Sequence, residues 1–143
     1  MRYLIILFIL LSTHKVNDRN IINYPVENNP NEKERILKAF IQVESSGNIF
    51  AYNKKERAAG ILQIRPIMVR EVNRLYDTDY KLVDRYDSIK SVQMFILYQA
   101  HYSRKLTIEL MARKWNAGPD GMSQLKATEN YYTKIKEAYA SID

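Results

Sequence analysis

Glu44 is the residue of this chain whose type and position indicate chemistry most directly. It continues an apolar stripe on a predicted helix, at the i+7 position of a pattern formed by Leu37, Phe40 and Ile41. A carboxyl group among apolar neighbours near a helix C-terminus has a raised pKa, because desolvation and the helix dipole both disfavour its charge. A carboxyl that keeps its proton near neutral pH is what a general acid for glycoside cleavage requires. The ordinary alternative is that the stripe leaves the core here and Glu44 is solvated.

The elements around Glu44 can be predicted from local signals. A Ser-Ser-Gly-Asn turn follows Glu44 at once, and Gly47 suits the C-cap of its helix. The same helix is expected to begin at Asn29-Pro30, where an N-cap residue precedes a proline at the first helical position. Residues 47–65 are expected to be irregular and permit a small hairpin without requiring one.

Capping and stop signals divide the rest of the chain into helices. Each expected helix begins at a proline or at a side chain that can accept from free backbone N–H groups. The predicted fold class is therefore all-α, a single compact helical domain with at most a small β-hairpin. The expected later helices are roughly 66–76, 88–105, 107–116 and 128–141, introduced by Pro66, Asp87, Thr107 and Thr128.

The composition excludes several classes of site. The chain has 143 residues, of which 46% are hydrophobic and 27% charged, as in a globular domain. Cysteine is absent, which excludes disulfides and thiolate metal sites. His14 and His101 are the only histidines, which argues against a two-histidine metal site. We expect no metal and no cofactor.

The formal net charge of +6 suits a polyanionic partner, either bacterial cell wall or nucleic acid. The cationic residues are scattered and form no clustered recognition helix, so we expect a solvated surface and no nucleic-acid partner. We also expect a monomer. The chain has eleven tyrosines against four phenylalanines. Tyrosine suits half-buried helix faces and also the walls of a sugar-binding groove.

The first fifteen residues resemble an export signal. Met1-Arg2 precedes an apolar run from Leu4 to Leu11, and polar residues follow. The run is too short to span a bilayer, which needs about 20 apolar residues, and no clear cleavage site follows it. We expect a signal peptide or uncleaved anchor at 1–15, a linker at 16–29 and the folded domain at 30–143. The protein is then exported to the periplasm, the cell envelope or the medium.

Four short segments occur together in an informative order. They are Glu44-Ser-Ser-Gly-Asn48, Ala59-Gly-Ile-Leu-Gln63-Ile64-Arg-Pro66, Trp115-Asn116-Ala-Gly-Pro119 and Tyr131-Tyr132-Thr-Lys134-Ile135. In this order and spacing they resemble the catalytic domain of the soluble-type lytic transglycosylases, within the lysozyme-like superfamily, over about residues 30–140. The resemblance implies a lysozyme-like helical fold with a substrate groove, and peptidoglycan glycan strands as substrate.

The resemblance also implies roles for single residues. Glu44 matches the family's one catalytic acid, and Ser45 matches the serine that follows it and helps to position it. Gln63 matches a glutamine that lines the groove beside the acid, and Asn116 matches an asparagine near the cleavage site. Tyr131 matches a tyrosine close to the carboxyl group of the acid.

The chain departs from the family pattern at three positions. Leu62 and Trp115 stand where Met and Tyr are usual. Asn53 lies near the place of a serine that often contacts the sugar N-acetyl group, so the identity of this contact stays open. Tyr132 is the alternative to Tyr131 if the register shifts by one. Ordinary structural roles also remain for the matched residues: a loop amide for the glutamine, a helix C-cap for the asparagine and a helix anchor for the tyrosine.

The reaction implied by the resemblance is cleavage between N-acetylmuramic acid and N-acetylglucosamine with formation of an anhydromuramyl end. One acid suffices for it, because the sugar's own C6 hydroxyl is the nucleophile. The segment after Glu44 offers only Glu56 as a second acid, flanked by Lys55 and Arg57. A hydrolytic lysozyme-type muramidase on the same fold and a non-catalytic wall-binding or structural module remain alternatives. The setting also stays open: remodelling of the bacterium's own wall, a secretion or conjugation apparatus, or a phage assembly.

Overall fold

The helix that carries Glu44 is one of five α-helices in the computed structural model, which describes residues 30–104 and 107–142. The expected leader and linker lie outside these residues. In the described part the predicted all-α class with a small hairpin is confirmed. The elements in order are α2 (Pro30–Ser45), β1 (Tyr52–Asn53), β2 (Ala58–Ala59), α3 (Pro66–Tyr76), the 3-10 helix η1 (Leu82–Tyr86), α4 (Ser88–Tyr102), α5 (Ile108–Ala117), the 3-10 helix η2 (Gly121–Ser123) and α6 (Leu125–Ser141).

A chain of aromatic rings in the core fixes α2, α4 and α5 relative to one another. The rings of Phe40 and Phe95 lie 4.9 Å apart, and Phe95 lies 4.9 Å from Trp115, both in edge-to-face geometry. Tyr98 completes the cluster 5.4 Å from Trp115. Such pairs stabilise a core by about 0.5–1.5 kcal/mol beyond the area they bury. The cluster thereby brings the C-terminal half of α2 close to the end of α5.

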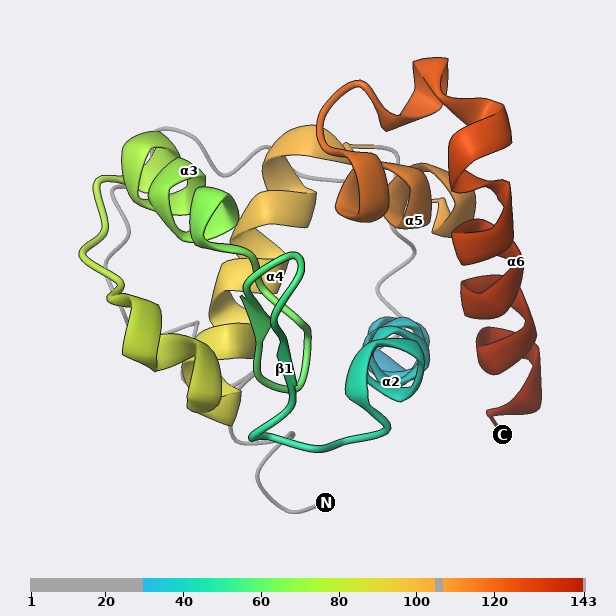
Figure 1. The fold of residues 1–143 in the computed structure, drawn as a ribbon. Coiled ribbons are helices and arrows are strands. Elements are labelled where there is room, and N and C mark those ends of the chain that lie inside the picture. Colours follow the sequence, from blue (N-terminus) through green and yellow to red (C-terminus); the bar gives the residue numbers. More distant parts are fainter. Residues whose placement is uncertain (1–29, 105–106, 143) are drawn as a thin grey trace.

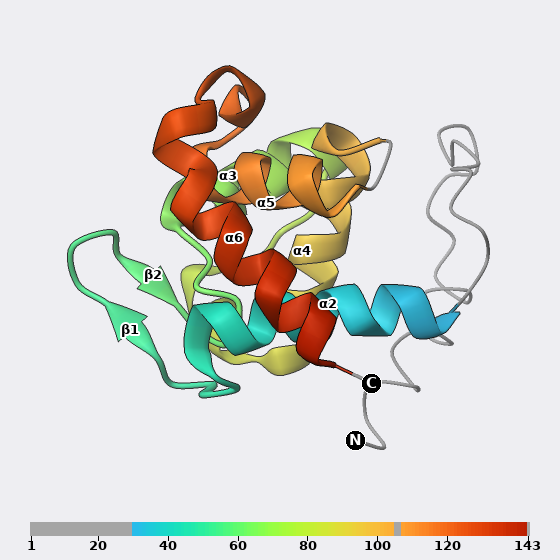
Figure 2. The ribbon, with the colours of Figure 1, turned by 90° about the vertical axis from the view of Figure 1, so that its right-hand side faces the viewer.

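Helix α6 packs against both α2 and α5. Figure 1 shows α2 almost end-on between the central α4 and the outer α6, with α5 above it. In the turned view, α6 crosses in front of α2 and α5, and the β1–β2 hairpin projects beyond the C-terminal end of α2 (Figure 2). The C-terminal end of α2 therefore lies next to α6 and leads directly into the hairpin.

Most helix starts agree with the sequence signals. α3 begins at Pro66, Asp87 caps α4 by accepting from the backbone N–H groups of Ile89 and Lys90, and Thr107 caps α5. The hairpin pairs Tyr52 with Ala59 and Asn53 with Ala58 in antiparallel register. No helix of residues 30–104 and 107–142 is long and apolar enough to cross a membrane.

Thr128 does not cap the last helix, and this prediction is wrong. α6 begins at Leu125, so that Thr128 lies inside its first turn, fully buried. Its hydroxyl oxygen accepts a hydrogen bond from Arg113 Nη1 at 2.8 Å and donates to the carbonyl of Gln124 at 2.9 Å. Thr128 thus lies on the inner side of the helix, where it pairs the buried guanidinium of Arg113 on α5.

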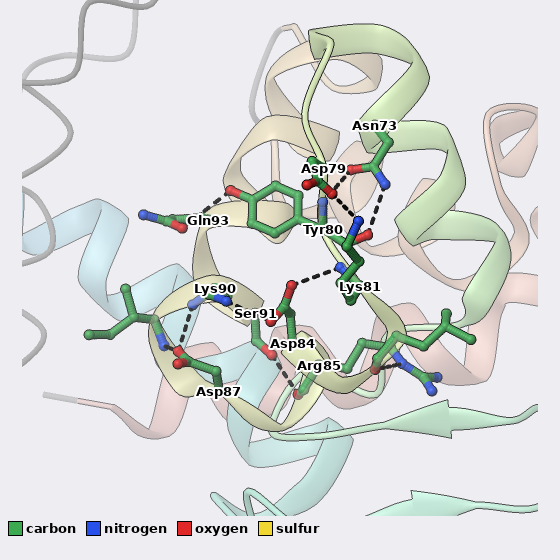
Figure 3. A network of polar contacts seen from close by, with 12 residues as sticks. Asn73, Asp79, Tyr80, Lys81, Asp84, Arg85, Asp87, Lys90, Ser91 and Gln93 are labelled. Atoms are coloured by element: carbon green, nitrogen blue, oxygen red, sulfur yellow. Dashed lines mark hydrogen bonds and ion pairs between the residues drawn. The ribbon is translucent and has the colours of Figure 1, made fainter.

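A polar network holds α3, η1 and α4 together on the side of the molecule drawn in Figure 3. The Asn73 side chain bonds the backbone of Tyr80 twice, and the Tyr80 hydroxyl donates to Gln93. Asp84 accepts from the backbone of Lys81 and from Lys90 Nζ. Asp84 is thereby engaged in the cap of η1.

Candidate active site

Glu44 and Tyr131 are in direct contact although they lie 87 residues apart. Glu44 is in the last turn of α2 and Tyr131 is in the second turn of α6. The Tyr131 hydroxyl donates a hydrogen bond to Glu44 Oε1. Both residues are only partly buried when the whole side chain is counted. The carboxyl group therefore lies in a recess that still opens to solvent.

The recess raises the pKa of Glu44 from 4.5 to about 7. Desolvation by the surrounding protein is the largest cause. Hydrogen bonds from the side chains of Tyr131 and Trp115 and the positive charge of Arg65 act in the opposite direction, and the charge of Glu56 adds a smaller upward contribution. At neutral pH the carboxyl group is thus present in both its acid and its base form.

Tyr131 keeps its proton under the same conditions. Its burial and the adjacent carboxylate raise the pKa of the phenol well above its ordinary value. Tyr132 faces another way, because its ring lies under the guanidinium of Arg113 at 4.8 Å. The register of α6 therefore brings Tyr131, and not Tyr132, to the carboxyl group of Glu44.

Ser45 and Gln63 bind the loop that faces the end of α2. Ser45 Oγ donates to the carbonyl of Ile61 at 2.8 Å. Gln63 Nε2 donates to the carbonyls of Ala51 and Gly60 at 3.1 and 2.9 Å. Both amide hydrogens of Gln63 are consequently engaged, and its side-chain oxygen is the group left to meet a ligand. Gln63 sits at φ +46°, in a tight turn closed by the bridge between Ala59 and Ile64.

Arg85 on η1 holds the loop that contains Gln63 in place. This residue was not identified from the sequence. Its side chain is buried, and Nη1 donates to the carbonyls of Arg57 and Ile64 at 2.7 and 3.1 Å. Its Nε donates to the carbonyl of Leu82 at 2.7 Å. Among the described residues it has no carboxylate partner, so its hydrogen bonds go to backbone. An arginine in a polar stretch gives no sequence signal for such a role, because its acceptors lie 21 and 28 residues away.

Trp115 and Asn116 lie in the last turn of α5 beside the recess. Trp115 is buried in the aromatic cluster and contributes a side-chain hydrogen bond that lowers the pKa of Glu44. Its carbonyl accepts from Arg65 Nη2 at 3.0 Å. Asn116 is half-buried, and within the described part of the chain its side chain makes no hydrogen bond. Its carboxamide is therefore available to a ligand.

Asn53 has a different environment. It is exposed in the hairpin, where its Oδ1 accepts from the backbone N–H groups of Lys55 and Glu56 at 3.1 and 3.3 Å. Its oxygen therefore closes the hairpin turn, which is an ordinary structural role for this residue type. Its contact with a sugar stays a prediction, as do the ligand contacts of Gln63 and Asn116.

A cavity of about 370 Å³ lies between α3 and the end of α5. Arg65 joins it to the recess, because the same guanidinium bonds the carbonyl of Trp115 and acts on the charge of Glu44. The cavity is lined by Arg65, Ile67, Met68, Glu71, Tyr98, Ala117, Gly118 and Pro119.

Comparison with known proteins adds one finding to this geometry. A family model described as the transglycosylase SLT domain matches residues 23–139. No curated protein and no solved structure matches the chain. The matched range covers the helices, the hairpin and the recess, and it supports a transglycosylase-type, glycan-cleaving function with peptidoglycan as substrate. The chain belongs to the transglycosylase SLT domain family.

Proposed function

We propose that the protein is a peptidoglycan lytic transglycosylase that cleaves the bond between N-acetylmuramic acid and N-acetylglucosamine, with Glu44 as its single general acid and base. The observation that carries the proposal is the desolvated carboxyl group of Glu44, with a pKa of about 7, in contact with Tyr131. One residue can donate and then remove a proton at neutral pH when its pKa lies near the working pH.

In the first step, Glu44 gives its proton to the bridging oxygen as the bond from that oxygen to C1 of the muramyl residue breaks. The acetamido oxygen of the same sugar stabilises the positive charge that develops at C1. The Tyr131 hydroxyl donates to the carboxylate that Glu44 becomes, which limits the cost of a buried charge.

In the second step, the Glu44 carboxylate removes the proton of the C6 hydroxyl, and the C6 oxygen forms a bond to C1. The products are a released N-acetylglucosamine end and a 1,6-anhydromuramyl end, and Glu44 is again protonated. No water is consumed. General acid–base catalysis of this kind contributes about 10²–10⁴-fold, so positioning of the strand must contribute much of the remainder.

The surroundings of Glu56 favour one acid over two. Glycosidases with two carboxyl groups place them about 5–10 Å apart across the scissile bond. Glu56 affects the pKa of Glu44 less than Tyr131, Trp115 and Arg65 do. Its side chain is half exposed in the hairpin, and its carboxylate lies 3.8 Å from Arg65 Nη1. It is therefore placed as a surface partner of Arg65.

The test is digestion of purified peptidoglycan by the full chain, followed by mass spectrometry of the fragment ends. The proposal predicts anhydromuramyl ends, which are lighter than reducing ends by one water. Glu44→Gln should give no fragments. Reducing ends would indicate a hydrolytic muramidase, and intact strands with retained wall binding would indicate a non-catalytic module.

We also propose that the protein acts outside the cytoplasmic membrane, because its substrate lies there. Residues 1–15 would supply the export signal. Fusion of residues 1–29 to a reporter enzyme that is active only after export tests this directly. Activity of the reporter supports export, and a reporter that stays inactive in the cytoplasm contradicts it.

A further inference from the structure

The cavity beside the recess contains one cation with unused hydrogen-bond donors. Arg65 donates from Nη2 to the carbonyl of Trp115. Its Nη1 lies 3.8 Å from the Glu56 carboxylate, which is beyond hydrogen-bond distance. A guanidinium carries five N–H groups, and in the described part of the chain one of its nitrogens has a hydrogen-bond partner. The side chain is 25% exposed, so the remaining donors are within reach of a ligand.

The one carboxylate that lines the cavity is already paired. Glu71 accepts from Arg74 Nε and Nη2 at 3.0 and 2.7 Å, and from the Tyr102 hydroxyl. These partners lower the pKa of Glu71 to about 2. The Glu71 charge is therefore balanced by Arg74 on the same helix. Arg65 has the half-exposed Glu56 as a loose ion-pair partner at 3.8 Å, and its remaining N–H groups are the cationic donors of the cavity wall that face a ligand.

The other lining groups are mostly apolar. Ile67 is 61% exposed at the rim, Met68 is buried beneath it, and Ala117 and Pro119 form the opposite side. A neutral sugar ring needs several hydrogen-bond partners around its hydroxyl groups. A cavity with one available guanidinium among alkyl groups suits instead a short aliphatic chain that ends in, or carries, a carboxylate.

We propose that this cavity binds the carboxylate-bearing lactyl-peptide arm of the muramyl residue, with Arg65 as the group that pairs its carboxylate. The inference rests on the proposed function, because it assumes a peptidoglycan strand in the recess. Peptidoglycan carries such an arm on each substituted muramyl residue, where methyl groups of lactate and alanine precede a free carboxylate. The cavity joins the recess through Arg65 and through the segment after Asn116, so it selects strands by their peptide as well as by their sugars.

The proposal is tested with two substrates of the same size that differ in whether their carboxylates are free or amidated. One is native, peptide-substituted glycan, and the other is the same glycan after carbodiimide-catalysed amidation of its free carboxylates. Native strands should be cleaved with a kcat/KM about tenfold higher, since a charge-assisted hydrogen bond contributes about 1.5 kcal/mol or more. The ratio of the two values is the readout, because damage to the fold lowers both.

A matched pair of variants adds a charge to the cavity without touching Arg65. Ile67→Glu and Ile67→Gln have similar shape, and the exposed position of Ile67 tolerates both. Ile67→Glu should reduce the native-to-amidated ratio toward one, whereas Ile67→Gln should keep it. Arg65→Gln should abolish the preference, and Arg70→Gln, at an exposed position of the same helix, should retain it.

Binding separates this inference from the proposed function. The Glu44→Gln protein is titrated calorimetrically with a soluble disaccharide-peptide in its free and its amidated forms, with about tenfold tighter binding expected for the free form. Equal kcat/KM for native and amidated strands, or equal ratios for the two Ile67 variants, would overturn the inference while the cleavage reaction stands. Absence of any cleavage would overturn the proposed function, and the calorimetric ratio would then decide on the cavity alone.

Discussion

The hydroxyl of Tyr131 on α6 donates to the carboxyl group of Glu44 on α2, and this bond opposes the desolvation that raises the pKa of Glu44. Tyr131→Phe removes the donor and keeps the ring. The pKa of Glu44 should then rise above 7, because the charged form loses its partner. The carboxylate that forms in the first step also loses this stabilising bond, so cleavage at pH 7 should fall about tenfold. The falling limb of the pH–rate profile, which reports deprotonation of the acid form of Glu44, should move to higher pH.

Tyr132→Phe is the control for this profile, because Tyr132 stacks under Arg113. Its pH dependence should match that of the wild type. If the profile shifts in Tyr132→Phe and stays unchanged in Tyr131→Phe, the hydrogen bond from Tyr131 does not set the pKa of Glu44 during the reaction.

The raised pKa of Glu44 has a consequence for stability. The carboxyl group has a pKa of about 7 in the folded protein and an ordinary 4.5, so between these values the folded state binds more protons than the unfolded state. The free energy of unfolding must therefore fall as the pH rises from about 4.5 to 7, by at most about 3 kcal/mol from this group.

Glu44→Gln removes this dependence while its amide oxygen can still accept from Tyr131. The variant should be as stable as the wild type at pH 4.5 and more stable at pH 8. Urea unfolding at the two pH values gives the difference directly. If Glu44→Gln is equally or less stable than the wild type at pH 8, the charged carboxylate of Glu44 does not destabilise the folded state.

Local signals in the sequence predicted much of the fold. Pro66, Asp87 and Thr107 mark helix starts because proline geometry and side-chain caps act within one turn. The position of Glu44 at the end of an apolar helical stripe predicted that its pKa is raised, because the pattern itself indicates a desolvated carboxyl group. The prediction that Thr128 caps the last helix was wrong, because its hydroxyl group instead pairs with the buried Arg113 on α5.

The parts of the site that depend on tertiary contacts could not be predicted. Arg65 meets the carbonyl of Trp115 across 50 residues, and Arg85 meets the loop around Gln63 from η1. Nothing in the residue types or spacing sets these pairings, since backbone carbonyls accept from any donor that the fold brings near. The resemblance located Gln63 and Asn116 by position in the chain, and their ligand contacts remain predictions.

Gly60 and Gly47 form a matched test of how tightly the loop after β2 is packed against η1. Both have positive φ, +78° and +84°, so alanine at either position is strained by about 1–2 kcal/mol. A Cβ at Gly60 would lie 1.7 Å from the carbonyl oxygen of Arg85, whereas a Cβ at Gly47 meets nothing within 4 Å. Gly60→Ala should therefore be destabilised well beyond Gly47→Ala in urea unfolding. Equal losses would mean that the loop moves away from η1 without cost.

Arg85 tests whether the loop that carries Gln63 must be held for activity. Arg85→Met keeps an apolar stem but leaves the carbonyls of Arg57, Ile64 and Leu82 without their donor, so the free energy of unfolding should fall by about 2–4 kcal/mol. In the fraction that stays folded at low temperature, KM should rise because the Gln63 loop is no longer fixed. Arg57→Met is the control, because its exposed side chain can be lost while its carbonyl remains, and it should change stability by less than about 0.5 kcal/mol. If Arg85→Met loses stability while KM and kcat stay at wild-type values, Arg85 supports the fold alone and does not position the groove.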